Sequence, residues 1–121
     1  MTRPIRFSLP FFIVSIFLAI SVRVSAQKIY TVENRYDADL KVFIVENRYD
    51  ADLLVYKVQN RYDADKPGLW FFVENRYDAD KKIFFVQNRY DADLLIFFVE
   101  NRYDAGWKNE KKVHLLLKET E

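Results

Sequence analysis

The sequence predicts an all-β domain built from a short repeat, and two observations indicate it. The octapeptide VENRYDAD, which begins at Val32, returns five more times with small changes, and its tyrosines are spaced by 13, 13, 15, 13 and 13 residues. A constant period of this kind is typical of one supersecondary unit repeated along the chain. The segments between the copies are short, rich in Val, Ile, Phe and Tyr, and bounded by Asn and Asp, as β-strands are.

The first 26 residues have the composition of an export signal. Arg3 and Arg6 are basic, and residues 9–22 are apolar except for two serines and a proline. At 14 residues this run is short for a transmembrane helix, which needs about 20. Small or branched residues up to Ala26 predict cleavage before Gln27, which leaves residues 27–121 as one secreted or periplasmic domain.

The charge and composition of residues 27–121 exclude several classes of partner. Three of the 19 Lys and Arg precede Gln27 and all 18 Asp and Glu follow it, so the net charge beyond the signal is −2. Basic residues alternate with acidic ones, so no basic patch for nucleic acid is expected. The chain has no cysteine, so neither a disulfide nor a lipid anchor on cysteine is expected. No membrane span is expected after cleavage, although Arg23 leaves an uncleaved anchor as the alternative.

Seven segments are expected to form strands: residues 28–32, 41–45, 54–58, 69–73, 82–86, 95–99 and 112–117. The alternation of a strand places one set of side chains on a single face: Ile29, Val42, Val55, Trp70, Ile83, Ile96 and Val113. The opposite face takes Tyr30, Phe43, Tyr56, Phe71, Phe84, Phe97 and His114. Both sets are largely apolar, so cover is expected on both faces.

The repeated motif is expected to form the corner between strands. Asn and Asp favour turns, the Arg pairs with an Asp or lies on the Tyr, and the small Ala suits a tight corner. Stacked copies then predict Arg–Asp and Tyr–Tyr ladders. The residues of this structural motif are Arg35, Tyr36, Asp37, Asp39; Arg48, Tyr49, Asp50, Asp52; Arg61, Tyr62, Asp63, Asp65; Arg76, Tyr77, Asp78, Asp80; Arg89, Tyr90, Asp91, Asp93; and Arg102, Tyr103, Asp104.

One spacing of 15 residues marks an insertion between Asp65 and Val73, where the sequence reads Lys66-Pro67-Gly68. We expect it to lengthen one turn and to leave the register of neighbouring strands unchanged. Trp70 beside it is the aromatic least like the repeat. A core position is favoured for Trp70, and a binding site around Trp70 and Lys66 is the alternative.

The paired aspartates of each corner have two interpretations. Several carboxylates together suit a hard cation such as Ca²⁺. However, each pair has an Arg two residues before its first Asp, which favours a structural role: the first Asp pairs with the Arg and the second caps a turn. Neither a metal site nor a cofactor is therefore predicted.

An enzyme is not predicted either. His114 is the only histidine, and a strand position favours packing over catalysis. Beyond the signal there is no serine or cysteine to act as a nucleophile, and only Thr31 and Thr120 carry an aliphatic hydroxyl. Hydrolysis by two carboxylates needs one acid and one base in different environments, whereas repeated corners make their environments alike.

A non-enzymatic structural or binding module is the expected role, without a specific biochemical function. Repeated Tyr, Arg, Asn and Asp resemble the residues of sugar-binding surfaces, so a glycan is one candidate ligand. The alternative is self-association as a fibril or surface subunit, since segments such as KIFFVQN have high β-propensity and low charge. Flanking Asp and Arg oppose such stacking.

The carboxy-terminal stretch YDADLLIFFVENRYDAGWKNEKKVHLLL resembles the 7(1) septoil knot domain family, small bacterial repeat proteins of uncharacterised function. The family repeat is carried by Tyr36, Ala38, Asp39 and their copies. The closing motif is Ala105, Gly106, Trp107, Lys108 and Asn109, followed by a basic and apolar strand over residues 111–117. The resemblance implies a compact β-prism-like fold with a deep seven-crossing torus knot. The 15-residue spacing and the Asn-Arg before each Tyr depart from the family pattern.

Overall fold

The computed structural model describes residues 22–120, so most of the predicted export signal lies outside the described residues. Nearly all of the ordered elements are short strands joined by 3-10 turns. The strands are β1 (Val22–Ser25), β2 (Lys28–Thr31), β3 (Leu40–Ile44), β4 (Leu53–Lys57), β5 (Leu69–Phe72), β6 (Lys81–Phe85), β7 (Leu94–Phe98), β8 (Gly106–Trp107) and β9 (Leu117–Thr120). The turns are η1 (Arg35–Asp37), η2 (Arg48–Asp50), η3 (Arg61–Asp63), η4 (Arg76–Asp78), η5 (Arg89–Asp91), η6 (Arg102–Asp104) and η7 (Glu110–Leu116).

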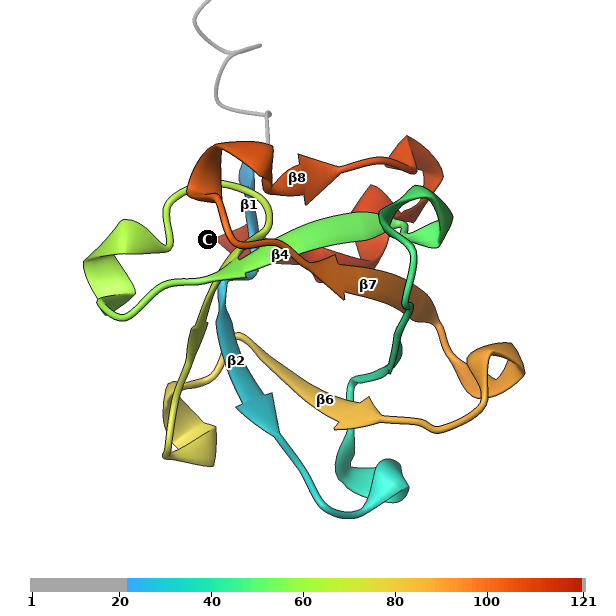
Figure 1. Ribbon diagram of the computed structural model, residues 1–121. Helices are drawn as coiled ribbons and strands as arrows, with labels where there is room; N and C mark the ends of the chain where they lie inside the picture. Colours follow the sequence, from blue (N-terminus) through green and yellow to red (C-terminus); the bar gives the residue numbers. More distant parts are fainter. Residues whose placement is uncertain (1–21, 121) are drawn as a thin grey trace, which may run out of the picture.

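Strands β2 to β7 form a closed parallel ring. Their order is β5-β2-β6-β3-β7-β4, and β4 also pairs with β5, so the sheet closes on itself. Figure 1 shows the ring as a roughly triangular outline with the 3-10 turns gathered at its corners. The first six predicted strands and the all-β repeat fold are therefore confirmed, with strand bounds that differ by one residue at most ends.

The interior of the ring is the face that the alternation predicted. Six of the side chains assigned to that face are completely buried: Ile29, Val42, Val55, Trp70, Ile83 and Ile96. Leu40, Leu53 and Leu94 complete this core from the first residues of their strands. The aromatic side chains of the outer face are half-buried, and side chains of the motif segments cover part of them: Arg61 lies over Phe71, and Phe43 and Phe97 pack against a second apolar cluster. The expected cover is therefore confirmed on the inner face and only partial on the outer face, where motif side chains and not a second sheet provide it.

The chain makes two circuits around the ring. Strands β2, β3 and β4 occupy alternate positions, and β5, β6 and β7 fill the gaps between them. Each step along the chain moves two positions around the ring, except that β4 passes directly to its neighbour β5. The insertion at Lys66-Pro67-Gly68 lies in this connection, so it marks the change from the first circuit to the second.

The strand register is the same throughout the ring. Lys28 pairs with Phe71, and the equivalent residues Lys41 and Leu54 pair with Phe84 and Phe97. The other three junctions match in the same way, including the one between β4 and β5, where Tyr56 pairs with Leu69. The prediction that the insertion leaves the register unchanged is confirmed.

The predicted seventh strand over residues 112–117 is wrong. Most of this segment is the 3-10 helix η7, and the seventh strand of the sheet is instead β8, which pairs antiparallel with β4. The η7 segment crosses the end of the ring where the strands begin: Lys112 Nζ donates to the Asp93 carbonyl before β7, and the Leu116 carbonyl accepts from the Ala26 amide before β2. Leu116 closes this end of the core and is 2% exposed.

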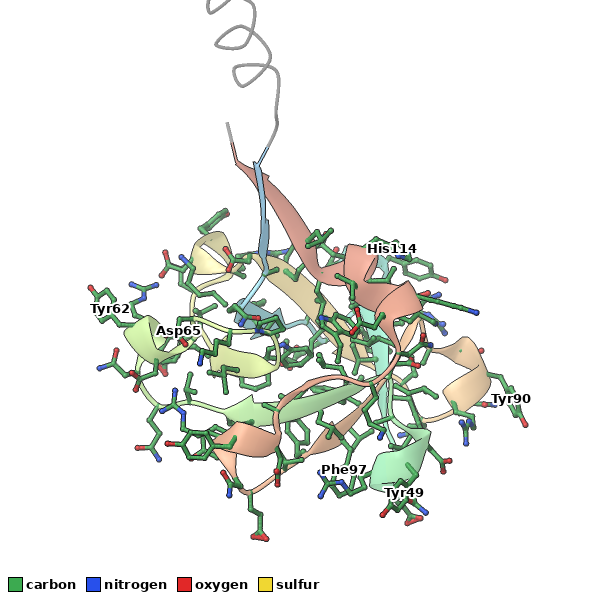
Figure 2. The ribbon with its side chains drawn as sticks, turned by 90° about the horizontal axis from the view of Figure 1, so that it is seen from above. Tyr49, Tyr62, Asp65, Tyr90, Phe97 and His114 are labelled. Atoms are coloured by element: carbon green, nitrogen blue, oxygen red, sulfur yellow. The ribbon has the colours of Figure 1, made fainter. Side chains whose placement is uncertain are left out.

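Beyond the ring, β1 and β9 form a separate antiparallel pair. Val22 pairs with Thr120 and Ser25 pairs with Leu117. Figure 2 shows the two strands leaving the body of the domain side by side. Residues 22–25, which the sequence assigned to the export signal, thus pair with the end of the chain in the uncleaved protein.

Candidate functional site

Every corner of the ring is built on the same local turn. In η1 the Oδ1 of Asn34 accepts the backbone N–H of Tyr36 at 2.9 Å, and the Asp37 amide donates to the Asn34 carbonyl at 3.0 Å. Asn favours such a turn because its side chain replaces a backbone acceptor. The same bonds recur at Asn47, Asn60, Asn75, Asn88 and Asn101. The predicted turn role of Asn is confirmed.

The second Asp of the motif joins neighbouring strands. Asp39 Oδ2 accepts the amide of Lys82 at 2.9 Å, and the Asp39 amide donates to the carbonyl of Lys82 at 2.7 Å. This two-bond arrangement, named here the aspartate clamp, also joins Asp52 to Leu95, Asp80 to Lys28, and Asp93 to Lys41. The predicted role of the second Asp as a turn cap is thus wrong: Asn caps the turn, and Asp clamps a strand distant in sequence.

Asp52 also anchors the closing motif. Its Oδ1 accepts from Asn109 Nδ2 at 3.1 Å, and its carbonyl accepts the amides of Lys108 and Asn109. Asp52 is 8% exposed, whereas Asp65, at the same motif position before the insertion, is exposed. The closing motif therefore holds the carboxy-terminal segment on the ring through one buried aspartate.

The predicted ladders do not form. Among residues 22–120, no first Asp of a motif makes an ion pair with a motif Arg, and the tyrosines make no ring pair with one another. The six tyrosines are instead between 78% and 89% exposed, and each belongs to its own 3-10 turn. Figure 2 shows Tyr49, Tyr62 and Tyr90 pointing outwards at separate corners.

Over residues 22–120, three of the hollows beside the turns are made from equivalent positions of different repeats. Hollow A has a volume of about 450 Å³ and is lined by Tyr30, Thr31, Val32, Glu33, Asn34, Asp37 and Arg76. Hollow B, of about 520 Å³, is lined by Phe71, Phe72, Val73, Glu74, Asn75, Asp78 and Arg61. Hollow C, of about 510 Å³, is lined by Phe97, Phe98, Val99, Glu100, Asn101, Asp104 and Arg48.

The hollows share one chemical composition. Each contains an aromatic side chain from the outer strand face, a Glu, an Asn and the first Asp of a motif. The Arg comes from the turn that follows the neighbouring strand of the ring, which belongs to a different repeat. In hollow B the Arg61 guanidinium lies 6.0 Å from the centre of the Phe71 ring. Each hollow therefore presents an aromatic surface beside two carboxylates, an amide and a guanidinium.

Sequence reasoning identified the types of residue in these hollows but not their grouping. Arg76 and Asp37 lie in different copies of the motif, and the copies meet only because the second circuit fills the gaps of the first. The sequence does carry one relevant signal: the residue before the motif Asn is Glu in some copies and Gln in others, and all three hollows use Glu copies.

The other candidate residues lie elsewhere. Trp70 is completely buried, so the favoured core position is confirmed and the alternative binding site around Trp70 and Lys66 is not formed. Its ring packs edge-on against Phe72. His114 is exposed on η7 rather than packed in a strand, a further correction (Figure 2).

Two other features concern metals and membranes. Within the described part of the chain, no group of three or more His, Asp or Glu side chains is placed to hold a metal ion. None of the helices over residues 22–120 has the length and apolar character needed to cross a membrane.

Comparison with known proteins agrees with the repeat and extends into the closing motif as far as Lys108. Searches of curated proteins and of solved structures each found no match. The sequence pattern of the 7(1) septoil knot domain matches residues 26–108, which is more than half of the 121 residues and includes strands β2 to β8. This protein therefore belongs to the 7(1) septoil knot domain family.

Proposed function

We propose that the domain is a non-enzymatic, exported binding module that takes neutral saccharides in its repeated hollows. The observation that carries the proposal is the recurrence of one lining at three places on the ring. Their volumes of about 450 to 520 Å³ fall in the range of small-molecule sites. A repeated shallow site suits a ligand that is itself a repeated polymer, because linked contacts raise the overall affinity.

The lining suits a sugar ring. Carboxylates accept hydrogen bonds from hydroxyl groups, a guanidinium donates to them, and an amide does both. The aromatic side chain beside these groups offers an apolar face for the C–H face of a sugar. Hollow B shows the combination most clearly, with Phe71, Glu74, Asp78 and Arg61 around one space.

The charge of the hollows favours a neutral ligand. Each hollow contains two carboxylates and one guanidinium, so its formal charge is negative. A sulfated or phosphorylated polymer would meet like charge there, which costs affinity. The net charge of −2 beyond residue 26 acts in the same direction.

Assembly into a fibril receives less support from the ring. Each of the strands β2 to β7 already pairs with two neighbours, so these strands offer few free backbone groups to another chain. The segments with high β-propensity lie within this ring.

The test is a glycan array followed by calorimetric titration with the best neutral oligosaccharide, using the purified full chain as the host exports it. We expect more than one site per chain. Replacing Arg76, Arg61 or Arg48 by Ala should each remove one site, and the triple variant should lose binding. Binding with one site per chain, or unaltered by the triple variant, would refute the proposal.

Tyr77→Ala is the matched control. Tyr77 is 88% exposed and lies on the same turn as Arg76, but it does not line any of the three hollows. Unchanged affinity in this variant, together with loss in Arg76→Ala, would place the ligand in the hollow. The reverse pattern would place it on the exposed tyrosines instead.

A further inference from the structure

We propose that the carboxylate of Asp80 binds the new amino terminus that signal cleavage creates at Gln27. The inference rests on the proposed cleavage between Ala26 and Gln27 and is independent of saccharide binding. Its basis is a hydrogen bond that the uncleaved chain already makes: the backbone N–H of Gln27 donates to Asp80 Oδ2 at 3.1 Å.

Asp80 differs from the other aspartates that form a clamp in the number of amides that its Oδ2 atom accepts. The Oδ2 atoms of Asp39, Asp52 and Asp93 each accept one amide, that of Lys82, Leu95 or Lys41. Asp80 Oδ2 accepts two, because the amide of Lys28 donates to it at 3.0 Å in addition to that of Gln27. The extra bond is made by the atom that cleavage would turn into a terminal amine.

Cleavage changes the charge of this atom while leaving it in place. Hydrolysis of the Ala26–Gln27 bond adds one water, and the Gln27 nitrogen becomes an ammonium group at neutral pH. An ammonium group beside a carboxylate makes a shorter and stronger hydrogen bond than a neutral amide does. Gln27 is only 6% exposed, so water screens this pair weakly.

Cleavage also removes the other contacts that hold this segment. Strand β1 is lost, and with it the pairing to β9 and the bond from the Ala26 amide to the Leu116 carbonyl. Strand β2 would then begin at the new terminus, where the Asp80 bonds and the bond that the Phe71 amide donates to the Gln27 carbonyl remain. The charged pair with Asp80 replaces the lost attachment.

A chemical consequence follows for Gln27 itself. An amino-terminal glutamine cyclises when its neutral amine attacks its own side-chain Cδ: the N–Cδ bond forms, the Cδ–Nε2 bond breaks, and ammonia leaves. Asp80 opposes this step because a carboxylate beside the amine favours its protonated form, which has no lone pair for the attack. The mature protein should therefore retain an uncyclised Gln27.

The experiment compares the exported wild-type protein with Asp80→Asn and Asp93→Asn, each expressed as the full chain. Asn is isosteric with Asp and keeps an acceptor oxygen, so it removes the charge without removing the hydrogen-bond geometry. Asp93 is the matched control, because its clamp holds Lys41 far from any terminus. Intact-mass spectrometry gives the cleavage site and follows the loss of ammonia during incubation at neutral pH.

We expect a product that begins at Gln27, with ammonia lost about tenfold faster in Asp80→Asn than in either wild type or Asp93→Asn, since one charged pair of about 1.4 kcal/mol corresponds to that factor. Equal rates of ammonia loss in the two variants would refute the pairing of the Gln27 amine with Asp80, although the predicted cleavage site would still stand. A product that begins elsewhere would overturn the inference at its first step.

A second measurement needs no variant. In the folded wild-type protein, an amine-reactive reagent should label the terminal amine of Gln27 more slowly than in the same protein unfolded by denaturant, after correction for the lysines. Labelling at the same rate in both states would contradict the ammonium–Asp80 pair.

Discussion

At the scale of single residues, the same aspartate of the motif has different roles in different copies. Asp39, Asp80 and Asp93 each clamp a neighbouring strand, and Asp52 does so while also holding Asn109. Asp65, the copy before the insertion, is exposed and accepts no strand amide within the described residues. The strands that adjoin each corner thus determine which second Asp forms a clamp, and Asp52 is the one that is buried.

Replacing Asp52 by Ala should lower the free energy of unfolding by about 2 to 4 kcal/mol, because a buried carboxylate that accepts the Leu95 amide and the Asn109 side chain is lost. Asp65→Ala should change it by less than about 0.5 kcal/mol, since its side chain is solvent-exposed. Urea denaturation of both variants measures the difference. Equal effects at the two positions would mean that the Asp52 bonds contribute nothing.

Glycine is required at position 68 for a steric reason. Its φ is +89°, and an added Cβ would lie 2.6 Å from the Leu54 carbonyl oxygen and 2.7 Å from the Gly106 amide nitrogen. Gly68 thus lies where β4, β8 and the insertion meet. At Gly106, φ is +146° and an added Cβ would meet no atom within 4 Å.

We therefore expect Gly68→Ala to destabilise the protein more than Gly106→Ala does, since the second carries only backbone strain of about 1 to 3 kcal/mol. Thermal unfolding followed by circular dichroism compares the two. A smaller loss of thermal stability in Gly68→Ala would show that the connection between β4 and β5 can move enough to accommodate a Cβ at position 68.

At the scale of elements, η7 stabilises the ring although its sequence resembles a strand. Burial in residues 112–117 does not follow the alternation of a strand. His114 and Leu116 would share one face of a strand, but Leu116 enters the core and His114 faces solvent. A strand there would need a free edge at the right place, and the seam between β4 and β5 is already closed by their own pairing and by β8.

Leu116→Ala should cost about 2 to 5 kcal/mol, as for other buried leucines that leave a cavity. His114→Ala, in the same element but exposed, should cost less than about 0.5 kcal/mol. The midpoint of chemical denaturation distinguishes them. Similar small effects would indicate that η7 does not close the core.

The Asn side chains that cap the 3-10 turns also stabilise the fold at the scale of elements. Asn88→Ala removes the hydrogen bond that the Tyr90 amide donates to Asn88 Oδ1 and should cost about 1 kcal/mol, as loss of a side-chain cap usually does. Tyr90→Ala, at a side chain that is 89% exposed, should leave the stability nearly unchanged. A larger loss from the tyrosine would point to a contact at the corner that the cap does not provide.

At the scale of the whole molecule, the two circuits distinguish this fold from a linear stack of repeats. In a solenoid each repeat contacts its sequence neighbours, and stability grows roughly in proportion to repeat number. Here the ring neighbours of β6 are β2 and β3, so each strand depends on strands from the other circuit. Loss of one strand opens the ring.

Deleting residues 80–92, which form one 13-residue period, should therefore abolish cooperative unfolding rather than reduce stability in proportion. Near-ultraviolet circular dichroism through a thermal scan shows whether a single transition survives. A shortened chain that still melts in one sharp step would favour a linear solenoid. The deep knot implied by the family resemblance stays a prediction, and slow refolding after denaturation is its expected signature.

Local sequence was sufficient for the repeat, the six ring strands, their buried face and the turn role of Asn. Each of these depends on residues within one period, such as the alternation around Val42 or the bond from Asn34 to Tyr36. The strand partners, the aspartate clamps, the hollows and the fate of residues 112–117 required the folded chain. They arise where residues of different repeats meet, as Asp39 and Lys82 do, and identical repeats carry no signal that says which copy pairs with which. Which copies pair is determined by the closure of the ring, which brings these residues together.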